Sequence, residues 1–410
     1  MVVPSPLIEE SVIPIATCPV CGGRSISEFL SRARVPVHQN LLMKDAETAV
    51  NTVRGDLSLA LCESCGFIFN QAFDLSKLRY GEDYDNTQSC SNLFDEYLND
   101  LVRHLVVERA VQNCRIVEVG CGKGSFLKKL VDWEGAGNSG YGFDPSYIGP
   151  ETEYEGRLRF ARRYYGPECA DIPADVVICR HVIEHVPAPL TLLRAIKQAL
   201  VHSPSSRVFF ETPCVEWILR NRVFWDFFYE HCSYFTGESL TTAFEIAGFR
   251  VESVRRVFGG QYLWLEASAS TDKLVINKQP ASIPRLTKDF TARENELKTG
   301  WESKIQRLAA NGKVALWGAG AKGVNLANLV DAERKWITCV VDLNPQKQGR
   351  YIPGTGHPIV DFRDLPSHGV NVAVLMNPNY RSESLALLRE AHLSINLVDL
   401  TEDEEYQANH

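Results

Sequence analysis

The chain has 410 residues, of which 45% are hydrophobic and 10% aromatic, and its charged groups sum to −8 at neutral pH. This length exceeds what a single hydrophobic core usually supports, so we expect two or three domains. The acidic balance, with no block of Lys and Arg, argues against a nucleic-acid backbone as a partner. The opening MVVPSPLIEESVIP has no basic start, and no stretch reaches the ~20 apolar residues of a membrane span. We therefore expect a soluble, cytoplasmic protein.

Four of the twelve cysteines form two close pairs near the start of the chain, in TCPVCGGR and LCESCGFI. Each pair is Cys-x-x-Cys followed by glycine, a turn that can direct two thiolates at one cation. Disulfides or a redox function are the alternative, but reduced thiols and a metal suit a large chain without a signal peptide. We predict a zinc-binding domain over residues 1–75. Its ligands to a structural Zn²⁺ would be Cys18, Cys21, Cys62 and Cys65.

Residues 76–270 are predicted to form the next domain, which opens with a helix. In LFDEYLNDLVRHLVVERAV, the apolar residues Phe94, Leu98, Leu101 and Leu105 recur at helical spacing. The following RIVEVGCGKGSFLKKLV predicts a strand, a glycine turn and a helix, and later segments continue to alternate between the two kinds of element. This alternation predicts an α/β fold with a mostly parallel, Rossmann-like sheet.

The motif VEVGCGKG predicts the cofactor of this domain. An acidic residue before Gly-x-Gly-x-Gly, with a second acid after the next strand, is typical of S-adenosylmethionine binding. Asp144 is the second acid and could accept hydrogen bonds from both ribose hydroxyls, while Glu118 would face the cationic methionine end. A glycine turn required only for packing is the alternative. The predicted cofactor-binding residues are Glu118, Gly120, Cys121, Gly122, Gly124, Asp144, Pro145, Arg180, His181 and His185.

The histidines of CRHVIEHVP have a spacing that also suits a metal-binding helix, but the sequence shows no third ligand. We therefore favour a lining of the cofactor pocket. After a polar linker and a helix from about Leu286 to Ala310, within residues 271–310, the α/β alternation restarts. Residues 311–410 are predicted to form a smaller Rossmann-like domain. Its WGAGAKG motif, with Asp342 after the next strand, would by itself suggest NAD binding.

The order of these motifs, together with YEHCSYF and VVDLNPQKQGRYIPGT, resembles the zinc-containing, S-adenosylmethionine-dependent sugar C-methyltransferases of deoxysugar biosynthesis. The resemblance covers nearly the whole chain and makes the central domain a class I methyltransferase. It implies a nucleotide-linked keto sugar as substrate and His231 as the base that removes a proton beside the ketone. The catalytic residues implied are His231, Glu230, Tyr229, Tyr84 and Tyr80.

The resemblance also assigns the C-terminal domain to the nucleotide end of the substrate. The residues implied there are Gly318, Gly320, Lys322, Asp342, Asn344, Tyr380 and Arg381. The sequence departs from the family at Phe228, where a tyrosine is usual, so the enolate would need a hydroxyl from Tyr229, Tyr80 or Tyr84.

Several alternatives remain at this point. The enzyme could methylate oxygen or nitrogen of another nucleotide-linked or phosphorylated acceptor, or could be an NAD-dependent oxidoreductase. The zinc module could belong to a non-catalytic scaffold, and the C-terminal glycine turn could be scaffold alone. His231 could merely satisfy a buried hydrogen bond. We expect a monomer or a homodimer.

Overall fold

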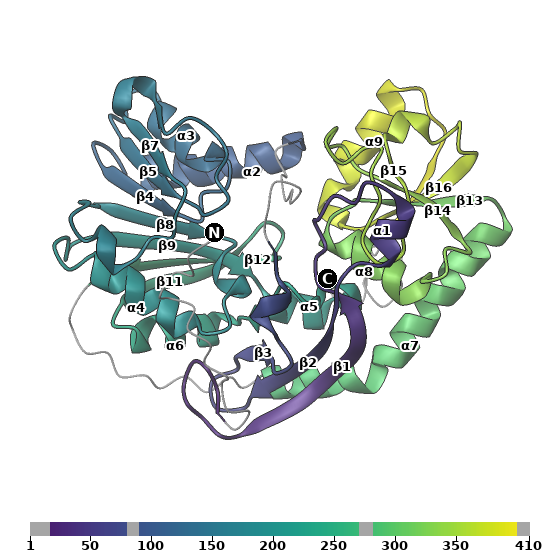
Figure 1. Cartoon of the computed structure of the whole chain (residues 1–410), viewed down its shortest axis with the longest axis horizontal. Coiled ribbons are helices and arrows are strands. Elements are labelled where there is room, and N and C mark those ends of the chain that lie inside the picture. The colour runs from purple at the N-terminus through teal and green to yellow at the C-terminus, as the bar shows by residue number, and fades with distance from the viewer. Residues whose placement is uncertain (1–16, 80–89, 270–281, 400–410) are drawn as a thin grey trace.

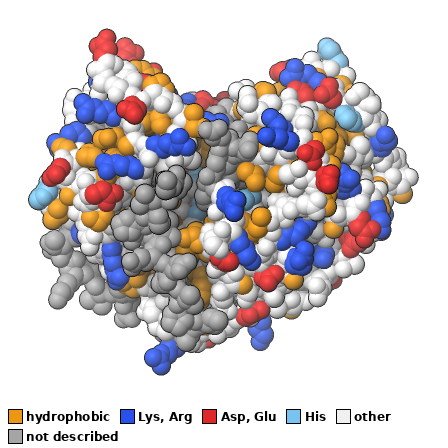
Figure 2. Space-filling view, in the orientation of Figure 1, with side chains coloured by type: hydrophobic (Ala, Val, Ile, Leu, Met, Phe, Trp, Pro, Cys, Tyr) orange, Lys and Arg blue, Asp and Glu red, His pale blue; other side chains and the backbone are white. Residues whose placement is uncertain are grey.

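The computed structural model describes residues 17–79, 90–269 and 282–399. Figure 1 shows two α/β lobes side by side, with a small antiparallel sheet beneath them. The surface is hollowed between the lobes, as the notch at the top of Figure 2 shows. Within the described ranges, no helix is long and apolar enough to cross a membrane.

The small sheet joins the N-terminal segment to a much later part of the chain. Its strands are β1 (Ile26–Pro36), β2 (Arg54–Cys62), β3 (Ile68–Asn70) and β10 (Ser233–Tyr234), in the order β1-β2-β3-β10. Strand β10 belongs to the YEHCSYF run and pairs antiparallel with β3. A short helix, α1 (Ala46–Val50), and a 3-10 turn, η2 (Leu75–Lys77), complete this segment.

The left-hand lobe of Figure 1 contains an eight-stranded sheet in the order β11-β12-β9-β8-β4-β5-β7-β6. Five neighbouring strands are parallel, whereas β12 lies antiparallel between β9 and β11. The strand bounds are β4 (Arg115–Val119), β5 (Ser139–Phe143), β6 (Thr152–Glu153), β7 (Leu158–Ala161), β8 (Val176–Arg180), β9 (Arg207–Pro213), β11 (Arg250–Val257) and β12 (Tyr262–Ser268). The chain order reverses between β4 and β8, and ligands of open α/β sheets bind at such a switch point.

Helices cover both faces of this sheet. They are α2 (Asn92–Arg103), which continues as a π-helical turn over His104–Glu108, α3 (Ser125–Asp132), α4 (Pro189–Ala199), α5 (Val215–Arg220) and α6 (Gly237–Ile246). Five 3-10 or π turns lie between them: η3 (His104–Glu108), η4 (Tyr154–Gly156), η5 (Pro167–Cys169), η6 (Ile183–His185) and η7 (Phe224–Asp226). The four apolar residues that predicted the first of these helices, from Phe94 to Leu105, are all buried. The predicted α/β class, with its Rossmann-like central sheet, is confirmed.

The right-hand lobe contains a five-stranded sheet in the order β15-β14-β13-β16-β17, and every pair is parallel. Its elements are β13 (Lys313–Trp317), α8 (Ala321–Val330), β14 (Ile337–Val341), β15 (Ile359–Val360), η8 (Phe362–Asp364), β16 (Val370–Leu375), η9 (Pro378–Tyr380), α9 (Arg381–Glu390) and β17 (Asn396–Val398). This is the second Rossmann-like sheet that the alternation predicted.

A long helix, α7 (Ile283–Ala310), connects the parts of the molecule. The Thr291 hydroxyl donates to the carbonyl of Phe29 in β1 over 2.7 Å, and Glu294 pairs with Arg32 at 2.8 Å. The Trp301 ring meets Trp225 of η7 edge to face, with the centroids 5.0 Å apart. The segment begins three residues before its predicted start, and most of the expected linker lies outside the described residues. Because its side chains contact both other parts, α7 fixes their arrangement.

The packing of β2 on the later chain gives a test of this arrangement. A Cβ atom on Gly55 would lie 2.3 Å from the fully buried ring of Tyr229. We expect Gly55→Ala to lower the free energy of unfolding by about 1–3 kcal/mol, because the ring has no room to move. Denaturant titration measures the change.

Gly300 in α7 is the matched control, since a Cβ there meets nothing within 4 Å. Gly300→Ala should raise the free energy of unfolding by roughly 0.5–1 kcal/mol through helix propensity. Equal stabilities of the two variants would contradict the packing described.

Candidate active site and metal centre

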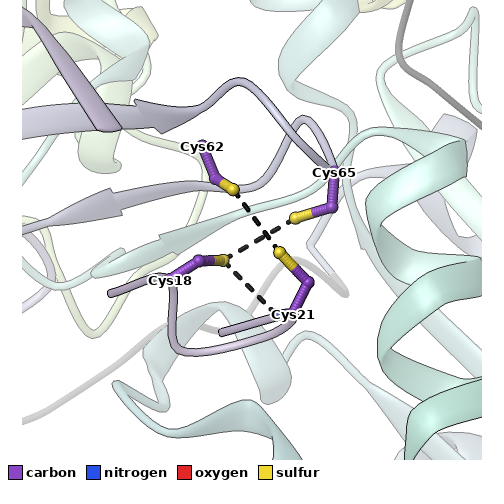
Figure 3. A group of neighbouring side chains, drawn as sticks. All are labelled: Cys18, Cys21, Cys62 and Cys65. Carbon is purple, nitrogen blue, oxygen red and sulfur yellow. Dashed lines mark hydrogen bonds between the residues drawn. The ribbon is translucent and has the colours of Figure 1, made fainter. Parts of the chain in front are cut away.

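The four cysteines of the two Cys-x-x-Cys pairs converge on one point (Figure 3). The Sγ atoms of Cys18 and Cys65 are 3.7 Å apart, and those of Cys21 and Cys62 are 3.5 Å apart. Zn–S bonds of about 2.3 Å in a tetrahedron put the sulfurs about 3.8 Å from one another. The cluster therefore has the size of a four-sulfur metal site, and a disulfide of about 2.05 Å would need much closer sulfurs.

Backbone amides already stabilise negative charge on these sulfurs. The amides of Val20 and Gly23 point at Sγ of Cys18 and of Cys21 over 3.4 and 3.3 Å. A hydrogen bond with Cys62 raises the pKa of Cys18 to about 12, and the neighbouring thiols also raise the pKa of Cys65. Four crowded thiols can lose their protons together only if a cation lies among them. The residues present thus fit a metal ion.

In the glycine loop after β4, some glycines pack tightly against side chains and one leaves the backbone open to a ligand. Gly120, Gly122 and Gly124 all have positive φ, between 53° and 74°. A Cβ at Gly120 would lie 2.2 Å from Val182, and one at Gly124 2.4 Å from the Phe160 ring. At Gly122 a Cβ would meet nothing within 4 Å. Two of these glycines are therefore needed for packing, and the third leaves the backbone open to a ligand.

The two acids of the motif lie on either side of this loop. Asp144, directly after β5, accepts hydrogen bonds from the amides of Gly122 and Ser146 over 2.9 and 2.7 Å. Glu118 is only 4% exposed, and its Oε2 has no hydrogen-bond partner among the described residues. Burial raises the pKa of Glu118 to about 8, although the charge of Arg180 opposes the shift. Cys121 is buried beside them, and Pro145 is exposed.

A buried carboxylate, Glu211 of β9, organises the end of β8. Arg180 donates to its Oε2 over 2.6 Å, the Tyr97 hydroxyl donates to its Oε1, and His181 lies 3.5 Å away. His181 has a positive φ of 53°, which turns the chain sharply after the strand. Sequence reasoning missed Glu211 and Tyr97. The sequence feature that could have revealed Glu211 is an acidic residue inside the apolar run RVFFETP, since a buried charge needs partners.

His231 lies against His185 and Glu184. The rings of His231 and His185 are 4.8 Å apart, and the ligand atoms of all three residues lie within 4.8 Å of one another. Burial, and then the charge of His185, lowers the pKa of His231 well below its usual value, so its imidazole is neutral. Burial would raise the pKa of Glu184, but neighbouring histidines, His181 first, lower it to about 2. No pattern in the sequence indicates that His231 lies beside the histidines that follow β8.

The turn that carries His231 is held at several points. The Tyr234 hydroxyl bonds both the amide and the carbonyl of Phe228, over 2.9 and 3.1 Å. The Ser233 hydroxyl donates to the carbonyl of Val186 over 2.7 Å, and Nδ1 of His185 donates to the carbonyl of Glu230 over 3.0 Å. These bonds attach the turn to η6, so the backbones that carry His231 and His185 are held in a fixed relative position.

The side chains of Glu230 and Tyr229 form hydrogen bonds with the N-terminal segment. Glu230, 1% exposed, accepts from the Gln39 amide over 2.9 Å and from Nδ1 of His38 at 3.2 Å. The Tyr229 hydroxyl accepts from the amide of Asp74 and donates to its carbonyl. These contacts give Tyr229 no free hydroxyl for an enolate and make Glu230 an anchor. Tyr80 and Tyr84 lie outside the described residues.

The glycine turn of the C-terminal lobe satisfies its own polar groups. Asp342 accepts a hydrogen bond from the Ala319 amide, between Gly318 and Gly320, over 3.0 Å. Lys347 donates to the Ala319 carbonyl over 3.2 Å and is 4% exposed. In a dinucleotide site the acid binds a ribose and the loop amides approach the pyrophosphate. Here these groups bond one another.

The remaining predicted substrate residues of this lobe lie apart. Asn344 is buried beside Asp342. Lys322 pairs with Asp226 of η7 at 2.7 Å and lies over the Trp217 ring of α5, so it reaches the methyltransferase lobe. Tyr380 packs on Phe258, also of that lobe, whereas Arg381 pairs with Asp399 within its own lobe. Of these groups, Lys322 is the one whose charge acts on His231.

Comparisons with known proteins agree with this architecture. A methyltransferase domain family matches residues 92–254, and a C-methyltransferase C-terminal domain family matches residues 277–393. The C-methyltransferase NovU of Streptomyces niveus is 26% identical over 413 residues, covering 92% of this chain and 93% of that protein.

Solved structures of methyltransferases are also similar to part of the chain. The 1,6-didemethyltoxoflavin-N1-methyltransferase of Burkholderia thailandensis has a TM-score of 0.33 at 16% identity, covering 44% of this chain and 82% of its own. The magnesium protoporphyrin IX methyltransferase of Synechocystis PCC 6803 has a TM-score of 0.34 at 18% identity, covering 43% and 83%. At these scores the solved structures add no argument to the family matches.

The strand order, the acidic residues around the glycine loop and the family match define a class I S-adenosylmethionine-dependent methyltransferase. Its last part carries the C-terminal domain of the C-methyltransferases, and the likeness to NovU extends over nearly the whole chain. The predicted resemblance to C-methyltransferases is confirmed by these matches.

Proposed function

We propose that the protein transfers the methyl group of S-adenosylmethionine to a carbon atom of a nucleotide-linked keto sugar, with His231 as the base. The observation that carries the proposal is the position of His231, whose ring lies 4.8 Å from that of His185 in η6, the turn that follows β8. Strand β8 is the neighbour of β4, whose glycine loop is the proposed cofactor site. Base and methyl donor would therefore act at the same edge of the sheet.

The chemistry requires such a base. A carbon beside a ketone becomes a nucleophile when its C–H proton moves to the His231 nitrogen and the electron pair enters the enolate. The enolate carbon then attacks the sulfonium methyl group, the S–CH₃ bond breaks, and its electrons remain on sulfur. A histidine that is neutral in the resting enzyme can accept this proton. The rigid turn from Phe228 to Tyr234 supports the proposal because positioning provides much of the rate.

The cofactor would lie over the glycine loop. In this proposal Gly120, Gly122 and Gly124 approach it, with Asp144 on the ribose and Glu118 near the methionine end. Cys121, Pro145, Arg180, His181 and His185 would line the same pocket. The orphaned Oε2 of Glu118 supports this assignment, since a buried carboxylate oxygen without a partner suits a cationic ligand.

The C-terminal lobe would hold the nucleotide end of the substrate. Lys322 supports this role because its ammonium group, paired with Asp226 of η7 in the methyltransferase lobe, could bind a phosphate. The self-satisfied turn at Ala319 disfavours the alternative of an NAD cofactor. We further propose that the four-cysteine cluster binds a structural Zn²⁺, whose closed sulfur shell leaves no position for substrate.

Replacing the base tests the reaction type. We expect His231→Ala to reduce turnover by ~10²–10⁴-fold, because the carbon cannot be activated without a positioned base, while S-adenosylmethionine binding is retained. Turnover is measured by mass spectrometry with a labelled methyl donor and a panel of keto sugar nucleotides.

Exposed His202 provides the matched control, and His202→Ala should keep full turnover. A His231→Ala enzyme that is only slightly slowed, or a product methylated on oxygen or nitrogen, would refute the proposed chemistry.

Cofactor affinity should depend on pH through Glu118. Its pKa of about 8 means that the carboxyl is mostly neutral at pH 7 and mostly ionised at pH 9. If only the ionised form binds the cation, affinity rises by about tenfold between these values. Calorimetric titration at several pH values measures the rise.

Glu118→Gln should abolish this part of the pH dependence. Any titration of the ligand's own ammonium group remains in both proteins and is subtracted by the comparison. Identical pH profiles would show that Glu118 does not face the cofactor.

Removing one sulfur tests the metal. We expect Cys62→Ser to lose most of its bound zinc and to unfold at a lower denaturant concentration, because metal binding and folding of a cysteine cluster are coupled. Elemental analysis and denaturant titration give the two readouts. Cys90→Ser, at an exposed cysteine, should change neither. A wild-type protein without zinc would contradict the assignment.

A further inference from the structure

We propose that Glu184, His185 and His231 form a second divalent-cation site, separate from the cysteine cluster, which binds a transition-metal ion such as Zn²⁺ or Co²⁺. Their ligand atoms lie within 4.8 Å of one another, and small side-chain rotations would bring them to the spacing of about 3.3 Å that tetrahedral Zn–N and Zn–O bonds require. Two imidazoles and one carboxylate are a common ligand set for Zn²⁺ and neighbouring ions. Three protein ligands also leave a coordination position open.

The carboxylate has an oxygen to spare. Glu184 is 1% exposed, and Thr212 donates to its Oε2 over 3.0 Å. Its Oε1 is buried and makes no hydrogen bond within the part of the chain that the structure describes. Nδ1 of His181 is an ion-pair neighbour of Oε1 at 3.3 Å, and this oxygen has a second lone pair for a cation. Buried polar atoms normally have a partner, and a cation between the three residues would provide one.

The two imidazoles are set up to coordinate. His185 donates from Nδ1 to the carbonyl of Glu230, which leaves the lone pair of Nε2 for an ion. Histidine ligands of metals generally donate their other nitrogen to a carbonyl or carboxylate in this way, which fixes the ring. His231 is held beside it by the contact of its ring with Phe228, 4.1 Å between centroids.

The backbone around the site is fixed before any ion binds. The Cys232 thiol contacts the carbonyl of Glu184, and the Ser233 hydroxyl donates to the carbonyl of Val186. These bonds join the turn that carries His231 to η6, which carries the other two ligands. The ion would therefore enter a formed site and would not have to pull separate segments together.

An ion at this site would inhibit the enzyme. Coordination uses the nitrogen lone pair of His231 that the proposed reaction needs for the proton, so ion and substrate would compete. This consequence rests on the proposed function, whereas the binding of the ion does not.

Cobalt titration tests the binding. Wild-type protein with zinc in the cysteine cluster should take up one further equivalent of Co²⁺, with the visible absorption of nitrogen and oxygen ligands and no thiolate-to-cobalt charge-transfer band. Glu184→Gln and His231→Ala should each weaken this binding by at least ~tenfold. The surface variant His202→Ala should bind as wild type. Retained zinc in the cysteine cluster and unchanged circular dichroism show that each variant is folded.

The proposal is overturned if no further equivalent binds, or if both ligand variants bind Co²⁺ as tightly as wild type. Activity assays with excess Zn²⁺, reversed by a weak chelator that leaves the cysteine cluster filled, then separate the two claims. Ion binding without inhibition would refute the role of His231 as base and leave the cation site standing. Absence of ion binding would refute the cation site and leave the base untouched.

Discussion

The structure depends on the fixed turn from Phe228 to Tyr234. Its two ends are joined by the Tyr234 hydroxyl, its strand pairs with β3 of the N-terminal sheet, and its backbone accepts a hydrogen bond from His185. A histidine on such a turn can neither leave the site nor rotate freely into solvent. The N-terminal sheet therefore helps to hold the turn that carries His231.

This dependence explains why an acid precedes the histidine. The backbone carbonyl of Glu230 holds His185, while its carboxylate holds His38 and the Gln39 amide. Because Nε2 of His38 accepts from the Arg79 amide, its Nδ1 carries the proton and donates to Glu230. One buried residue thus joins the methyltransferase lobe to the N-terminal segment. Its charge is satisfied there, as a buried carboxylate requires.

Sequence patterns predicted the helices, strands and motifs better than the contacts between residues that are far apart in the chain. The Cys-x-x-Cys-Gly pairs, the glycine loop and the apolar spacing of α2 are local, because each depends on residues a few positions apart. The contact of His231 with Glu184 and His185 depends on long-range bonds between its turn and η6, which no local pattern encodes. The same applies to Tyr229. From the sequence its hydroxyl could contact a substrate, but in the fold this hydroxyl accepts a hydrogen bond from the Asp74 amide.

The two glycine turns show how similar motifs acquire different properties. After β4, the acid Asp144 bonds Gly122, yet the space above Gly122 stays open and Glu118 keeps an oxygen without a partner. After β13, Asp342 bonds Ala319, and Lys347 from the following segment lies over the same turn, bonded to Asn40 of the N-terminal domain at 3.4 Å. A lysine and an asparagine placed there occupy the position at which a dinucleotide would approach. Lys322 lies on the side of α8 that faces η7, where it pairs with Asp226. In the proposed function, the second Rossmann-like sheet would therefore contribute through Lys322, which its first helix presents to the other lobe.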